Sequence, residues 1–176
     1  MKLRTRTATT LLALSSFITT AAQPSAPDAA AALLDHLAGR WVMTGTIGGK
    51  QTTHDVDAEW VLEREYLQLH EVSREKETNG HPAYEAIVYL SWDARAKEIV
   101  CLWLDNTAGG GLSAQGLAHG ALSADSIPLV FTLPGNETLH TTFQYDKAAD
   151  LWRLTIDDVK NGATDRFADV RLMRAR

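Results

Sequence analysis

The chain has 176 residues, 45% of them hydrophobic, with a formal net charge of −5 at pH 7 and a single cysteine. This length suits one domain whose hydrophobic core is large enough to be stable without disulfide bonds, and the lone Cys101 excludes an internal disulfide. The acidic balance, without any basic run, disfavours nucleic acid and anionic membrane surfaces as partners, so we expect a small molecule or another protein.

The first 22 residues have the order of a secretory signal. A basic head with Lys2, Arg4 and Arg6 precedes an apolar run in residues 11–18, and small residues follow up to Ala22. This run is shorter than the roughly 20 apolar residues that cross a bilayer as a helix. We therefore expect cleavage after Ala22 and a soluble, more acidic product in the periplasm or outside the cell, with no membrane attachment.

Residues 23–27 are expected to form a leader, and residues 28–176 the domain itself. A short helix of alanines and leucines should open this domain, with Asp28 as its N-cap and Gly39 as its stop. Three leucines fall on one face of this helix, where they would cover an apolar opening: Leu33, Leu34 and Leu37.

From Trp41 onward the pattern changes to the period of two that is typical of strands. Polar turns separate about ten short segments. These segments are 41–47, 55–60, 66–72, 84–92, 99–105, 112–122, 127–133, 139–145, 151–158 and 167–173. No second helix is available as a crossover, which excludes a βαβ fold. The run 99–105 is apolar at nearly every position, as expected for a strand that is covered on both faces.

The short connections favour an up-and-down meander. A meander of about eight to ten twisted strands tends to close, which removes its exposed edges. We therefore predict an all-β fold, a single antiparallel barrel of about 8–10 strands after a short helix, rather than a β-sandwich.

The segment Leu37-Ala38-Gly39-Arg40-Trp41 resembles the start of the lipocalin and fatty-acid-binding (calycin) barrels, in which a short helix precedes Gly-x-Trp at the first strand. This resemblance implies that Trp41 plugs the closed end of the barrel and that a basic residue of the last strand packs over it. The last strand offers Arg171 and Arg174, and Arg171 is preferred. A guanidinium over an indole ring contributes about 1–2 kcal/mol when shielded from water.

Most of the remaining chain is similar to a bacterial family of uncharacterised lipocalin-like domains (the DUF1579 type). The similarity rests on Tyr84-Glu85-Ala86, on the segment 103–106 and on the glycine-rich loop after it. It implies the barrel fold but no activity. The haem-binding nitrobindins share the barrel plan and hold iron through a histidine late in the chain, whereas here no histidine follows His140, which argues against haem.

The six histidines lack the short spacing of metal ligands. We therefore expect no metal and no cofactor, although a site shared by His70 and His140 from different strands stays open. The glycine-rich segments match neither a nucleophile elbow nor a phosphate loop. Cys101 lies in the most apolar segment and should be an inert core thiol.

Polar and aromatic side chains inside the strands are the candidates for a ligand cavity, because such pockets combine apolar walls with a few polar anchors. These candidates are Trp60, His70, Tyr84, Glu85, Trp103, Asp105 and His140. The alternative is that the polar ones point outward to solvent. In residues 84–90 the alternation of side chains does not decide between the inward and the outward orientation, because the residues of both faces are largely apolar.

Three functions remain open at this point. The first is an exported module, monomeric or homodimeric, that holds a small, partly apolar molecule in the barrel. The second is a hydrolase or isomerase that uses a Glu or His of the cavity as general acid–base. The third is an accessory domain with a filled barrel and a protein-binding surface. An empty cavity would argue against the third, and a buried carboxylate–imidazole pair beside it would favour the second over the first.

Overall fold

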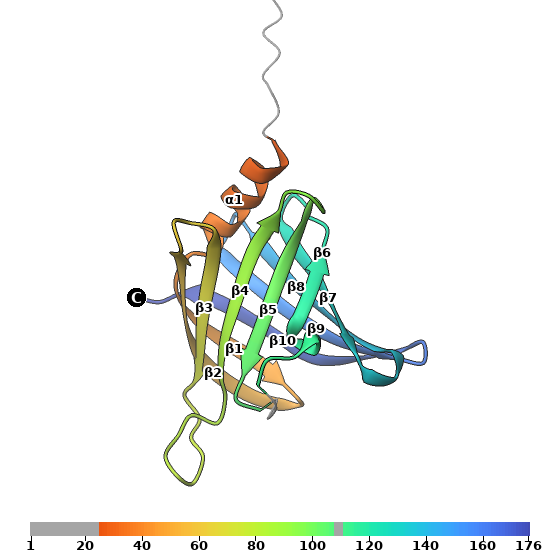
Figure 1. Cartoon of the computed structure of the whole chain (residues 1–176). Coiled ribbons are helices and arrows are strands. Elements are labelled where there is room, and N and C mark those ends of the chain that lie inside the picture. The colour runs from red at the N-terminus through yellow and green to blue at the C-terminus, as the bar shows by residue number, and fades with distance from the viewer. Residues whose placement is uncertain (1–24, 108–110) are drawn as a thin grey trace, which may run out of the picture.

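The computed structural model describes residues 25–107 and 111–176, which form a closed antiparallel barrel of ten strands preceded by one helix (Figure 1). The helix is α1 (Ala26–Leu37). The strands are β1 (Gly39–Ile47), β2 (Lys50–Val61), β3 (Tyr66–Ser73), β4 (Glu85–Asp93), β5 (Glu98–Asp105), β6 (Leu117–Gly120), β7 (Ser126–Leu133), β8 (Glu137–Asp146), β9 (Leu151–Lys160) and β10 (Ala163–Arg174). This confirms the predicted fold class. The expected signal over residues 1–22 lies outside the described residues.

Each strand pairs with the next one along the chain, and β10 pairs back onto β1 to close the barrel. Because successive side chains point to opposite faces, every second residue of a strand enters the interior. In β10, for example, Val170 and Leu172 are buried while Arg171 between them is exposed. No helix in the described part of the chain is long and apolar enough to cross a membrane.

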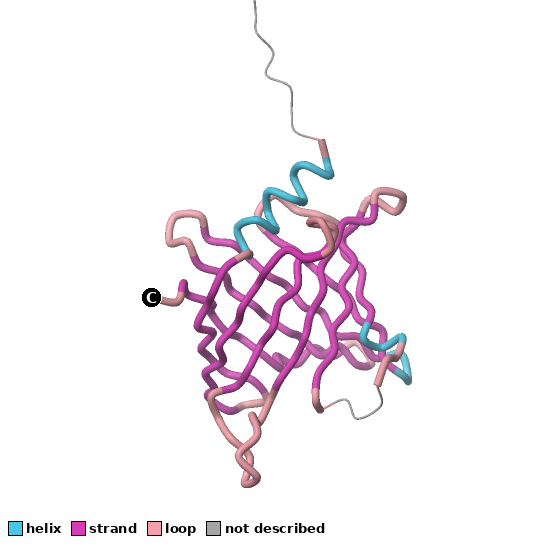
Figure 2. The backbone as a smooth tube through the Cα atoms, turned by 60° about the vertical axis from the view of Figure 1, so that its left-hand side comes forward, coloured by secondary structure: helices cyan, strands magenta, loops and turns pink. Residues whose placement is uncertain are grey.

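The helix α1 lies over one end of the barrel (Figure 2). It begins three residues before the predicted start, because Ser25 and not Asp28 is its N-cap. The Ser25 side chain accepts from the backbone N–H of Asp28, and Pro27, which has no N–H to leave unsatisfied, occupies the first turn. The leucine face is buried as expected from the sequence.

Trp41 and Arg174 close the same end. The indole of Trp41 is 1% exposed and donates to the carbonyl of Leu37 at 2.7 Å. The guanidinium carbon of Arg174 lies 3.8 Å from the centre of the Trp41 ring. Arg174 also donates to the carbonyls of Ala38 at 2.7 Å and His36 at 3.0 Å, which joins the last strand to the end of α1.

The preference for Arg171 as the closing residue is wrong. Arg171 pairs in register with Thr44 and points outward, whereas Arg174 is three residues further on and so faces the other side of β10. Gly39, with a φ of +124°, makes room for this arrangement, because a Cβ there would collide with the guanidinium of Arg174.

The segment 112–122 forms much less strand than predicted. A 3₁₀ turn (Ala114–Gly116) precedes β6, which has only four residues and pairs with β7 through two of them, Ala118 and His119. Pro128 of β7 has no N–H to give to the ladder, and Gly120 packs directly on its carbonyl. This shortens the β6–β7 pairing.

The apolar run of β5 is covered on one face only. Ile99 and Cys101 are buried in the interior, whereas Val100, Leu102 and Leu104 lie half-buried on the outer wall. The apolar run 99–105 predicted a strand covered on both faces, but the outer face of β5 is only half-buried.

Candidate functional site

The barrel is hollow at the end away from α1. A cavity of about 860 Å³ opens there, with apolar walls that include Met43, Trp103, Phe131, Leu139, Leu154 and Ile156. This volume lies within the range of about 300–1,000 Å³ that is typical of ligand pockets. The alternative of a barrel filled by its own side chains is therefore contradicted at this end.

One wall of the cavity carries a row of hydrogen-bonding side chains, which we call the polar strip. It consists of Thr52 and His54 from β2, Glu71 and Ser73 from β3, and Glu75 just after β3. Because β2 and β3 are adjacent and antiparallel, with His54 opposite Ser73, the inward residues of both strands form one continuous surface.

A chain of hydrogen bonds runs through the polar strip. Nδ1 of His54 is in short contact with Oε1 of Glu71, and both side chains are nearly fully buried. Nε2 of His54 lies 2.7 Å from Oγ1 of Thr52, and Thr52 donates its proton to Oε2 of Glu75 at 2.9 Å. Since a hydroxyl has a single proton, Nε2 of His54 must be the donor to Thr52. Both ring nitrogens are thus engaged.

The His54–Glu71 pair has no net charge as a unit. With Nε2 protonated, one further proton lies between Nδ1 and the carboxylate oxygen. If it sits on nitrogen the pair is a cation and an anion, and if it sits on oxygen both groups are neutral. The pair adds zero to the charge of the cavity in either case.

Glu75 is the fixed negative charge of the polar strip. Ser73 donates to its Oε2 at 2.7 Å, and the backbone N–H of Thr53 donates to its Oε1 at 3.0 Å. The hydrogen bond from Ser73, aided by the one from Thr52 and opposed by burial, lowers the pKa of Glu75 to about 2. Glu75 therefore stays ionised at every physiological pH.

Tyr84 and Trp103 extend the polar surface into an aromatic one. The Tyr84 ring stacks on His54 with centroids 5.6 Å apart, and its oxygen accepts from Nε1 of Trp103 at 2.9 Å. Burial, and then the charge of Glu71, raises the pKa of Tyr84 well above its usual range. Its phenol is thus held neutral. Asp105 also lines the cavity, so three of the seven sequence candidates share it.

The other four candidates lie outside the cavity. His70 and Glu85 form a pair on the outer wall at 2.8 Å, with side chains 41% and 46% exposed. His140 is exposed on β8, and Trp60 lies toward the closed end, where it donates to Asp35 at 2.7 Å. The acid–base hypothesis built on Glu85, His70 and His140 is therefore dropped.

The alternation of the strands carried a signal for the residues that were missed. Val56 is buried on the inner face of β2, so two residues earlier His54 faces inward as well. Leu69 is buried in β3, which places Glu71 inside and His70 outside. The polar residue that breaks the apolar pattern of β3 is thus Glu71.

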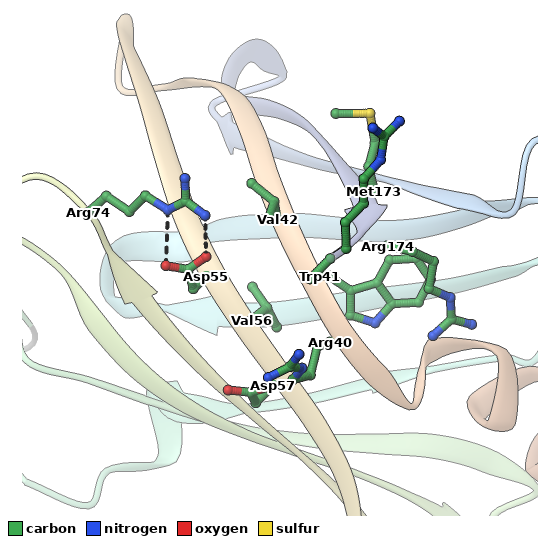
Figure 3. Close-up of a pocket in the computed structure, with 11 residues that line it drawn as sticks. Arg40, Trp41, Val42, Asp55, Val56, Asp57, Arg74, Met173 and Arg174 are labelled. Carbon is green, nitrogen blue, oxygen red and sulfur yellow. Dashed lines mark hydrogen bonds and ion pairs between the residues drawn. The ribbon is translucent and has the colours of Figure 1, made fainter.

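A second hollow, of about 720 Å³, lies on the outer wall where β1 and β2 meet the residues after β10 (Figure 3). Arg74 donates to both oxygens of Asp55 there, at 3.0 and 2.6 Å, and Arg174 lies against Trp41. These two arginines are held in contacts that stabilise the barrel. We therefore take the barrel cavity, with its buried polar groups, as the candidate site.

Among the described residues, no group of three or more His, Cys, Asp or Glu side chains is arranged to hold a metal ion. No protein-family model matches the chain, and no match is found among curated proteins. The function is therefore argued from the cavity.

Proposed function

We propose that this protein binds a small, partly apolar molecule inside its barrel. The observation that carries the proposal is a cavity of about 860 Å³, apolar over most of its wall, with the buried His54–Glu71 pair and its hydrogen-bonded neighbours on one side. Such a surface orients a ligand while the apolar walls supply the affinity. The residues proposed to contact the ligand are His54, Glu75, Tyr84, Trp103 and Asp105.

Export belongs to the same proposal. The basic, apolar and small-residue order of residues 1–22 supports a secreted or periplasmic protein, which would meet its ligand outside the cytoplasm.

The buried His54–Glu71 pair favours a second candidate, acid–base catalysis in the same cavity. Binding is better supported, because Nε2 of His54 is covered by Thr52, whose own proton goes to Glu75.

A cavity-filling variant tests the binding proposal. Ala168 of β10 is 1% exposed and lines the cavity, so Ala168→Phe places a phenyl ring inside it. Ala163 lies on the same strand but is exposed, which makes Ala163→Phe the matched control. The probe is the neutral fluorophore N-phenylnaphthylamine, whose emission rises in an apolar site.

We expect the wild type to bind the fluorophore and Ala168→Phe to bind it at least about tenfold more weakly, a loss of about 1.4 kcal/mol. Ala163→Phe should bind like the wild type, and circular dichroism checks that both variants are folded. Equal binding by a folded Ala168→Phe variant, or no binding by the wild type, would contradict the proposal.

A test for the second candidate is ester hydrolysis, which must disappear in His54→Gln if that residue is catalytic.

A further inference from the structure

We propose that the cavity selects organic amines, molecules with an apolar body and a protonated nitrogen, and rejects carboxylates such as fatty acids. This proposal rests on the binding function proposed above. It follows from the charges that line the cavity and from the groups already engaged in hydrogen bonds.

A carboxylate ligand would find little positive charge in this cavity. Among the described lining residues the basic side chains are His54 and Lys50. Both nitrogens of His54 are engaged with Glu71 and Thr52, and the pair is neutral as a unit. Lys50 is exposed at the rim. An anion carried past this rim into the barrel would therefore lose its hydration without a compensating ion pair.

A protonated amine would meet the opposite situation. Glu75 is a fixed negative charge that is exposed at the rim, so the ammonium group would sit at the opening while the apolar body lies inside the barrel. The side chains of Ser73 and Thr52 and the backbone groups of Thr53 and Glu75 hold this carboxylate in its ionised form, so it would attract an ammonium group through its charge. Asp105 adds a second carboxylate to the lining.

The rest of the wall agrees with this assignment. The rings of Tyr84, Trp103 and Phe131 border the cavity, and the faces of aromatic rings attract cations. Thr141, 2% exposed, also lines the cavity, and its hydroxyl makes no hydrogen bond within the described residues. This hydroxyl can accept from an ammonium group but can equally donate to another ligand, so the selectivity depends on the charges.

Three ligands with the same body test the proposal: phenylbutylamine, phenylbutanol and phenylbutyrate. Each is titrated at pH 7 against the full mature chain loaded with N-phenylnaphthylamine, and its displacement of the fluorophore gives its affinity. We expect the amine to bind best and the carboxylate at least about tenfold more weakly than the amine.

Two variants locate the cause. Glu75→Gln should reduce the affinity for the amine to that for the alcohol. Glu85→Gln, which removes a carboxylate from the outer wall, should leave the order unchanged. Because the three-ligand comparison in the wild type needs no variant, the proposal can be tested even if Glu75→Gln folds poorly.

Each result decides one of the two proposals. If phenylbutyrate binds as tightly as the amine, or if the three ligands fail to displace a bound fluorophore, the selectivity proposal is overturned and the binding function stands. An amine preference that survives unchanged in folded Glu75→Gln also overturns it. If the fluorophore itself does not bind, the proposed function fails.

Discussion

Replacing His54 by leucine would leave the Glu71 carboxyl in the barrel wall without its partner. Both side chains are nearly fully buried, at 3% and 5% exposure. Removing one member of a buried ion pair costs about 3–5 kcal/mol, because the remaining group is neither hydrated nor paired. Since a domain is stable by only about 5–15 kcal/mol, the variant should lose a large share of its stability.

Unfolding in guanidinium chloride, followed by tryptophan fluorescence, measures this loss. The midpoint should fall with little change in the slope m, because the surface exposed on unfolding is nearly the same. At about 2–4 °C per kcal/mol for a domain of this size, the melting temperature should drop by roughly 6–20 °C.

The chain contains a matched control in the His70–Glu85 pair, which joins the same residue types at 2.8 Å on the outer wall. His70→Leu should cost less than about 1 kcal/mol, since exposed pairs contribute little. Combining His54→Leu with Glu71→Met should recover most of the loss, because apolar residues of similar size often replace a buried pair at no cost. If His54→Leu costs no more than His70→Leu, the reasoning on the buried pair is refuted.

Three further predictions concern the closed end, the rim and the core. Arg174→Ala should destabilise the barrel by about 2 kcal/mol through loss of the Trp41 contact and two carbonyl hydrogen bonds, whereas Arg171→Ala should stay within about 0.5 kcal/mol, as thermal unfolding can show. The lowered pKa of Glu75 means that this carboxyl stabilises the fold above its unfolded pKa of about 4.3 and ceases to do so as the pH falls to about 2. After allowance for solvent screening, the wild type should exceed Glu75→Gln by about 1 kcal/mol at pH 7 in denaturant titrations, and a gap that persists at pH 2 would refute this assignment. Burial raises the pKa of Cys101 to about 12, so this thiol should react with a disulfide reagent only after unfolding; fast reaction of the native protein would contradict it.

The fold was predictable because the strands repeat a strong period-two signal between polar turns. Alternation in β2, where Val56 and Ala58 lie between acidic residues, specifies which face is buried. The same rule could have assigned Arg174 to the inner side from Val170 and Leu172. It could not show that the carbonyls at the end of α1 would lie within reach of that guanidinium.

The site was less predictable, because it depends on contacts between strands. The sequence indicates that Tyr84 and Trp103 are aromatic residues in strands, but their hydrogen bond joins residues on either side of the β4–β5 hairpin. Glu75 lies beyond the end of β3, where no period applies, and only the path of the chain brings it to Thr52. The cavity volume depends on the inward side chains of the whole barrel together, so no single segment encodes it.

The indole N–H signals in a two-dimensional ¹H–¹⁵N NMR spectrum test the central claim most directly, since the five tryptophans report on different parts of the barrel. Trp103 lines the cavity and Trp60 lies toward the closed end beside Asp35. On titration with N-phenylnaphthylamine, the Trp103 signal should shift in a saturable way while the Trp60 signal stays in place. A Trp103 signal that does not move, or a shift confined to Trp60, would contradict binding inside the barrel.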